Sequence, residues 1–153
     1  MEGGRGLLAG VVLLVGCGGD GGDGGTTPLE PIEDWACLHV AEGTIADAST
    51  DRADAGSIAP GRAPYRVNIV QAEPNYVAFD VSSAGTWTLL AEATGALPAV
   101  WEGDDRIELD AAVPDPSCEG DIPEMRTVEL APGPHHLEIG PIFQGNVWIV
   151  LGQ

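Results

Sequence analysis

Short segments in which apolar and polar residues alternate recur along most of the chain. In residues 65–70, Tyr65, Val67 and Ile69 fall on one side of an extended strand, and residues 75–81 and 146–151 repeat the pattern. This period of two is typical of half-buried strands. The predicted strands are 65–70, 75–81, 86–91, 126–130, 135–139 and 146–151, with shorter candidates at 37–41, 43–48, 97–102 and 105–109.

Turn signals separate these segments at short intervals. Ser82-Ser83-Ala84-Gly85 predicts a hairpin over 77–91, and Ala131-Pro132-Gly133 predicts a second one over 126–139. No window keeps a helical period over three turns, and prolines recur between positions 60 and 141. The pattern predicts an all-β fold, a single antiparallel β-sandwich of the jelly-roll or immunoglobulin-like kind.

The two predicted hairpins carry a recurring motif at the start of the return strand. Gly85-Thr86-Trp87-Thr88-Leu89 fits a "G-x-Y/W-x-L" pattern, whereas Gly133-Pro134-His135-His136-Leu137 has histidine where an aromatic residue is usual. Over about 65–151 the chain resembles prepeptidase C-terminal-like domains and related jelly-roll or immunoglobulin-like modules. The resemblance implies an accessory or binding module rather than a catalyst, and it carries over no catalytic residue.

A different pattern occupies the N-terminus. Arg5 precedes an apolar run over residues 7–15, which is shorter than the roughly 20 residues that span a bilayer. The run ends in Leu14-Val15-Gly16-Cys17, which resembles the lipobox of bacterial lipoproteins. The resemblance implies a signal peptide over 1–16, a lipidated (for example palmitoylated) Cys17 and, because Gly18 is not Asp, anchoring in the outer membrane of the cell envelope. A cleaved secretory signal with an incidental Cys17 is the alternative.

The next segment has the composition of a linker. Residues 17–34 begin with Gly/Asp repeats and continue with Pro28 and Pro31, so they offer little to bury. We therefore expect the folded domain to cover 35–153. It contains Cys37 and Cys118, which in an oxidising compartment most simply form a disulfide. Two thiolate metal ligands are the rival interpretation.

The charge balance excludes several functions. The chain has 24 Asp and Glu residues, only 6 basic residues, all of them Arg, and a net charge of −18. Such an acidic chain is repelled by nucleic acid. Without lysine it has neither a Schiff-base nucleophile nor a P-loop.

Three groups of residues are candidates for binding. His39, His136 and Glu138 have the ligand types of a zinc or copper site, with His39 expected on the same strand face as Cys37; unrelated histidines are the alternative. Asp104, Asp105 and Glu108 lie in an acidic stretch that suits calcium, or simply a solvated surface. Trp87 and Trp148 are expected opposite the aliphatic residues of their strands, where at least one would be exposed to a ligand; burial at an edge of the sandwich is the alternative.

Motifs for catalysis are missing from the sequence. It contains no G-x-S-x-G and no H-E-x-x-H, and no G-x-G-x-x-G lies between a predicted strand and a helix. We therefore expect a non-catalytic, lipid-anchored envelope protein, without a required cofactor, that binds an envelope protein or a glycan. A metal-binding envelope lipoprotein, with Zn, Cu or Ca, is the second hypothesis, and a hydrolase is the third.

Overall fold

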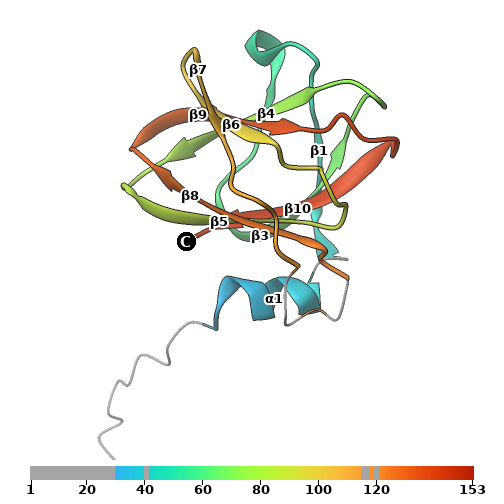
Figure 1. The fold of residues 1–153 in the computed structure, drawn as a ribbon, viewed down its shortest axis with the longest axis vertical. Helices are drawn as coiled ribbons and strands as arrows, with labels where there is room; N and C mark the ends of the chain where they lie inside the picture. The colour runs from blue at the N-terminus through green and yellow to red at the C-terminus, as the bar shows by residue number, and fades with distance from the viewer. Residues whose placement is uncertain (1–29, 40–41, 115–117, 119–120) are drawn as a thin grey trace, which may run out of the picture.

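The structure is a computed structural model that describes residues 30–39, 42–114, 118 and 121–153. It is a β-sandwich of two five-stranded sheets, as the alternation predicts (Figure 1). Sheet A has the strand order β1-β3-β10-β5-β8, and sheet B has the order β2-β4-β9-β6-β7. The bounds in sheet A are β1 Thr44–Asp47, β3 Gly61–Asn68, β10 Asn146–Gly152, β5 Gly85–Ala91 and β8 Glu124–Leu130. Those in sheet B are β2 Gly56–Ser57, β4 Asn75–Val81, β9 Gly133–Ile139, β6 Ala99–Glu102 and β7 Asp105–Glu108.

The apolar residues of the alternating strands meet between the sheets. Val77 and Phe79 of β4 and Leu137 of β9 pack against Leu89 of β5 and Ile149 of β10, and each is at most 2% exposed. These positions follow the period of two in the sequence. Nine of the ten predicted strands have counterparts in the structure, whereas β2 was not predicted.

The two predicted hairpins are wrong, because each of these turns crosses from one sheet to the other. Strand β4 pairs with β9, and β5 pairs with β8, both antiparallel. The segments 82–84 and 131–132 therefore form two arches that stack on each other. Both strands of each arch alternate in the same way, so the pattern identifies strands but not their partners. The positive φ values of Gly85 and Gly133, 157° and 138°, lie where each arch enters its next strand.

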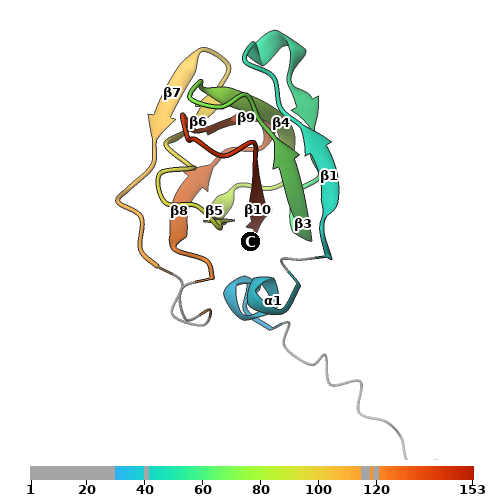
Figure 2. The same cartoon turned by 90° about the vertical axis from the view of Figure 1, so that its right-hand side faces the viewer.

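The predicted strand over 37–41 is also wrong in its described part, because Ile32–His39 forms a helix, α1. Ile32 and Ala36, four residues apart, are buried on the same face of this helix. They pack with Leu90 and Val150 on the outer face of sheet A, and Figure 2 shows α1 beneath that sheet. The helix begins inside the predicted linker, three residues before Trp35. Among the described residues, no helix is long and apolar enough to cross a membrane.

The disulfide prediction is confirmed. Cys37 of α1 and Cys118 are bonded, with their Cα atoms 5.3 Å apart. The bond ties the helix to the segment between β7 and β8, and Ile122 of that segment packs in the same small apolar cluster as Ile32. The helix is thus fastened to the sandwich by one covalent bond and by its buried face.

A buried carboxylate holds the connection between β5 and β6. The Glu124 side chain is completely buried and accepts backbone N–H groups from Ala96 at 2.7 Å and Leu97 at 3.2 Å. Arg126 pairs with the same carboxylate and also donates to the carbonyl of Leu109 at 3.4 Å. Because a buried charge is tolerated only with such partners, this group fixes how the chain passes from sheet A to sheet B.

Reduction of the disulfide should lower the melting temperature by about 10–20 °C. The two cysteines are 81 residues apart, and the chain-entropy model gives an upper bound of about 4.5 kcal/mol for a loop of that length. Thermal unfolding followed by circular dichroism, with and without reductant, measures the effect. A Cys37→Ser/Cys118→Ser double variant is the control and should melt with the reduced protein. A shift below about 2 °C in both would contradict a stabilising role.

Candidate functional site

The outer face of sheet B carries a row of functional side chains. The strand register sets His136 of β9 beside Trp101 of β6, and Trp101 beside Arg106 of β7. Their chain neighbours His135 and Val100 are buried in the core, so alternation turns this row outward. The tight β6–β7 hairpin, with Gly103 at φ 59°, is what brings Trp101 and Arg106 together.

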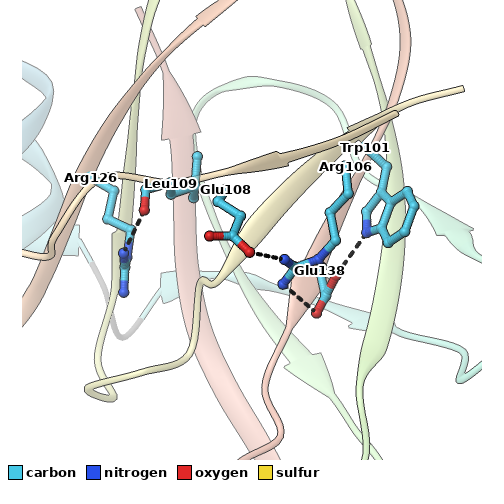
Figure 3. A network of polar contacts seen from close by, with 6 residues as sticks. All are labelled: Trp101, Arg106, Glu108, Leu109, Arg126 and Glu138. Atoms are coloured by element: carbon cyan, nitrogen blue, oxygen red, sulfur yellow. Dashed lines mark hydrogen bonds and ion pairs between the residues drawn. The ribbon is translucent and has the colours of Figure 1, made fainter. Parts of the chain in front are cut away.

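Glu138 organises these side chains from beneath. Its carboxylate accepts the Trp101 indole N–H at 2.7 Å and two Arg106 N–H groups at 2.9 and 3.2 Å (Figure 3). Arg106 also donates to Glu108 at 2.8 Å. The hydrogen bond that Arg106 donates to Glu138 raises the pKa of Arg106 above its ordinary value, although burial acts in the opposite direction. Trp101 is thereby held in one orientation on the sheet.

Arg52 covers the ring of Trp101. Its guanidinium lies 3.9 Å from the ring centroid, donates to the carbonyl of Gly103 at 2.7 Å and is 3.5 Å from the Asp104 carboxylate. Arg52 begins the short 3₁₀ helix η2 (Arg52–Asp54), and the Asp51 side chain caps this helix by accepting the Ala53 N–H at 2.9 Å.

The segment before η2 is itself attached to the sheet. Ser49 exchanges two backbone hydrogen bonds with Tyr76 of β4, at 3.1 and 2.7 Å, and its hydroxyl accepts the Asp51 N–H at 3.0 Å. Arg52 therefore contacts Trp101 from a segment that is held at Ser49 by strand β4 and at Asp51 by the cap of η2.

These elements enclose an open depression of about 760 Å³, which we call the sheet B hollow. Its lining consists of residues 50–53, the hairpin tip 103–104, Tyr76 and His136. A volume in this range is typical of small-molecule sites, which are about 300–1,000 Å³. The hollow therefore has the size and the polar groups of a ligand site.

His136 enters the hollow as a neutral ring. Burial lowers its pKa below 6.5 and the positive charge of Arg52 lowers it further, although the hydrogen bond with the Arg52 backbone acts in the opposite direction. The Nδ1 atom of His136 is buried and has no hydrogen-bond partner among the described residues. A neutral imidazole adds no charge to the lining of the hollow.

The structure does not bring the predicted zinc or copper ligands together. His39 is in α1, against sheet A, where its Nδ1 donates to the Trp35 carbonyl at 2.8 Å, whereas His136 is on sheet B. Glu138 is occupied by Trp101 and Arg106. In the described part of the chain, no three His, Cys, Asp or Glu residues are grouped to hold a metal ion.

The three candidate calcium ligands are spread along the β6–β7 hairpin. Asp104 faces Arg52, and Glu108 is paired with Arg106. Asp105 is exposed on β7, and it belongs to no metal-type group among the described residues. Two of these carboxylates are thus paired with arginines, and of the two pairs only Asp104–Arg52 lines the hollow.

The tryptophan prediction is wrong for Trp87. Trp87 is 5% exposed and lies on the same strand face as Leu89, in the core. Trp148 is half-buried and lies opposite the core residues Val147 and Ile149, on the outer face of sheet A. There its ring lies so close to Gly43 that a Cβ atom on Gly43 would be 2.2 Å away. Neither tryptophan lines the sheet B hollow.

The site residues that sequence reasoning missed are Arg52, Arg106 and the role of Trp101. The one available signal was Gly103-Asp104 between two alternating segments, which predicts a two-residue hairpin and hence the pairing of Trp101 with Arg106. Nothing local to Arg52 indicates that it packs on a ring 49 positions away. Cys17 and the lipobox lie outside the described residues.

No family model matches this chain, and no curated protein matches it. Among solved structures, the chain is similar to one described as "CBM35 from Cellvibrio japonicus Abf62", with 19% sequence identity, coverage of 72% of this chain and 83% of that one, and a TM-score of 0.32. The function must therefore be argued from the chain's own residues.

Replacing Arg106 with Lys should lower the free energy of unfolding by about 1–2 kcal/mol. Lysine cannot make the two-pronged contact that Arg106 makes with Glu138, whose side chain is only 9% exposed. Arg106 is itself 33% exposed, so solvent screening keeps the loss well below that of a fully buried pair. Urea unfolding measures the loss, and a shift in tryptophan fluorescence should accompany it. Arg62→Lys on β3 is the matched control; equal losses in both variants would refute the role of Arg106.

The stability of the protein should fall as the pH drops below about 6.5, partly through His136. Its folded-state pKa is lowered, so the unfolded chain takes up this proton first and stability declines from the ordinary pKa down through the folded one. Urea unfolding at about pH 7.5 and about pH 5 measures the decline in the wild type and in His136→Gln. The variant should lose less stability over that interval. Parallel pH curves would show that His136 does not contribute.

Proposed function

We propose that this protein is a non-catalytic binding module, held at the cell envelope by a lipid on Cys17, with the sheet B hollow as its ligand site. The observation that supports the binding site is the chain of contacts from Glu138 through Trp101 to Arg52. These contacts fix the polar groups of the hollow before any ligand binds. Fixed polar groups around a depression reduce the entropy lost on binding.

Several features of the hollow favour binding over catalysis. The carboxylates nearest to it, Asp51 and Asp104, are engaged with the Ala53 N–H and with Arg52. His136 has a buried, unpartnered Nδ1 rather than a hydrogen bond to a nucleophile. Groups that are committed to holding a surface in shape are suited to recognition.

The arrangement of the molecule also suits display on a tether. The described residues begin just before α1, which lies on the outer side of sheet A (Figures 1 and 2). The hollow is on the outer face of sheet B, and so on the other side of the sandwich. A lipid on Cys17 would attach through the Gly/Asp-rich residues that precede α1. The hollow would then be free to face away from the membrane, and the absence of Asp at position 18 supports the outer membrane as the location.

Replacing Arg52 with Ala should weaken binding at the hollow at least about tenfold. The variant removes the guanidinium and with it the contacts to Trp101, Gly103 and Asp104. Binding of the full chain to an array of immobilised glycans and proteins measures the effect. Thr127→Ala, on the exposed surface of sheet A, is the control and should bind like the wild type. If Arg52→Ala binds the immobilised ligand as strongly as the wild type does, the ligand binds outside the sheet B hollow.

Replacing Cys17 with Ser should abolish lipid attachment without unfolding the sandwich, because residue 17 precedes the first described element by more than a dozen positions. Incorporation of radiolabelled palmitate into the expressed chain is the measurement. The Cys37→Ser/Cys118→Ser variant, in which Cys17 is intact, is the control and should still be labelled. Labelling that survives Cys17→Ser would disprove the anchor.

A further inference from the structure

Each charged side chain in the lining of the sheet B hollow has a polar contact within the protein. Arg52 is the basic residue of the lining, and it is 3.5 Å from Asp104 and 2.7 Å from the Gly103 carbonyl. Asp51 accepts the Ala53 N–H with one of its oxygens. His136 adds no charge at neutral pH. A site whose charges already have partners gains little from a charged ligand, because the ligand must compete with those partners.

The same lining offers donors and acceptors side by side. Arg52 has only N–H donors, whereas the carboxylates of Asp51 and Asp104 only accept. Thr50 and Tyr76 bring hydroxyl groups that do both. The two carboxylates would repel a phosphate, sulfate or carboxylate group, and Arg52 would repel a lysine-rich or arginine-rich segment. A ligand hydroxyl group, which donates and accepts at once, can satisfy both kinds of neighbour.

The ring of Tyr76 adds a surface of a different kind. It lines the hollow and is half-buried, whereas the ring of Trp101 is covered by Arg52. An aromatic side chain with a polar tip suits a ligand that has apolar C–H surfaces between hydroxyl groups. The field of the whole chain, with its net charge of −18, also opposes polyanions.

From this chemistry we infer that the sheet B hollow binds a neutral, polyhydroxylated ligand, an uncharged glycan. The inference rests on the proposed function and names the ligand class of the same site. The alternatives, an anionic glycan and a basic protein segment, differ from it in charge and hence in their response to salt.

The test compares how strongly three kinds of probe bind to the full-length protein, which is kept in detergent. The neutral probes are soluble mannan, xylan, galactan and β-glucan; the anionic probes are polygalacturonate and alginate; the basic probe is polylysine. Affinity electrophoresis and calorimetry give the binding strength at about 50 and about 500 mM salt. We expect binding to at least one neutral probe, with less than a twofold change in affinity between the two salt concentrations.

Two variants locate that binding. Asp104→Ala removes a carboxylate acceptor whose side chain is fully exposed. Tyr76→Phe removes one hydroxyl group from the lining but keeps the ring. Neither substitution should disturb folding. Each should weaken binding to the neutral probe at least about fivefold, a loss of about 1 kcal/mol per hydrogen bond. Thr127→Ala on sheet A is the matched control and should bind normally.

The other outcomes separate the inference from the proposed function. Binding to polygalacturonate, alginate or polylysine that these two variants weaken would overturn the neutral-glycan inference and leave the hollow as a binding site. If no probe binds, or if binding to every probe is unaffected by Asp104→Ala and Tyr76→Phe, both the inference and the assignment of the hollow are wrong.

Discussion

The stacking of the two arches is the constraint on which the rest of the molecule depends. Strand β4 pairs with β9 in sheet B while β5 pairs with β8 in sheet A, so two turns far apart in the sequence must cross the sandwich side by side. This arrangement places the apolar faces of four strands around one core. It also fixes the register of β9 against β4, and hence the positions of His136 and Glu138 relative to Tyr76. The strand residues of the candidate site therefore depend on the fold's central pairing, and residues 50–53 and 103–104 of the connecting segments complete its lining.

Two buried carboxylates perform the same task at different places in the sandwich. Glu124 accepts the backbone N–H groups of Ala96 and Leu97 and pairs with Arg126, and so holds the connection between the sheets. Glu138 holds Trp101 and Arg106 on the outer face. Glu124 is satisfied by backbone N–H groups and by an arginine of its own strand, and Glu138 by side chains of β6 and β7. Such a group favours one arrangement of its partners, because any other leaves a charge buried without compensation.

Sequence reasoning found what depends on local periodicity and missed what depends on pairing. The alternation of Val77, Phe79 and Val81 identified β4 with its bounds, since a period of two has a direct structural meaning. The same pattern says nothing about which strand lies alongside, and so both hairpins were misassigned. The helix α1 was missed because it is two turns long and is stabilised by the disulfide and by Ile32 and Ala36. The contact of Arg52 with Trp101 has no local signature at all.

The unequal covering of the two sheets explains why the candidate site is on sheet B. The outer face of sheet A bears Leu90 and Val150, which are apolar and are covered by α1 and the disulfide-linked segment. The outer face of sheet B bears Trp101, Arg106 and Glu138, whose polar groups satisfy one another while leaving the hollow open. An apolar face must be covered to be stable, and here the N-terminal helix serves that purpose. A polar face that is satisfied by its own side chains needs no cover, and it remains available to a ligand that competes for few of those contacts.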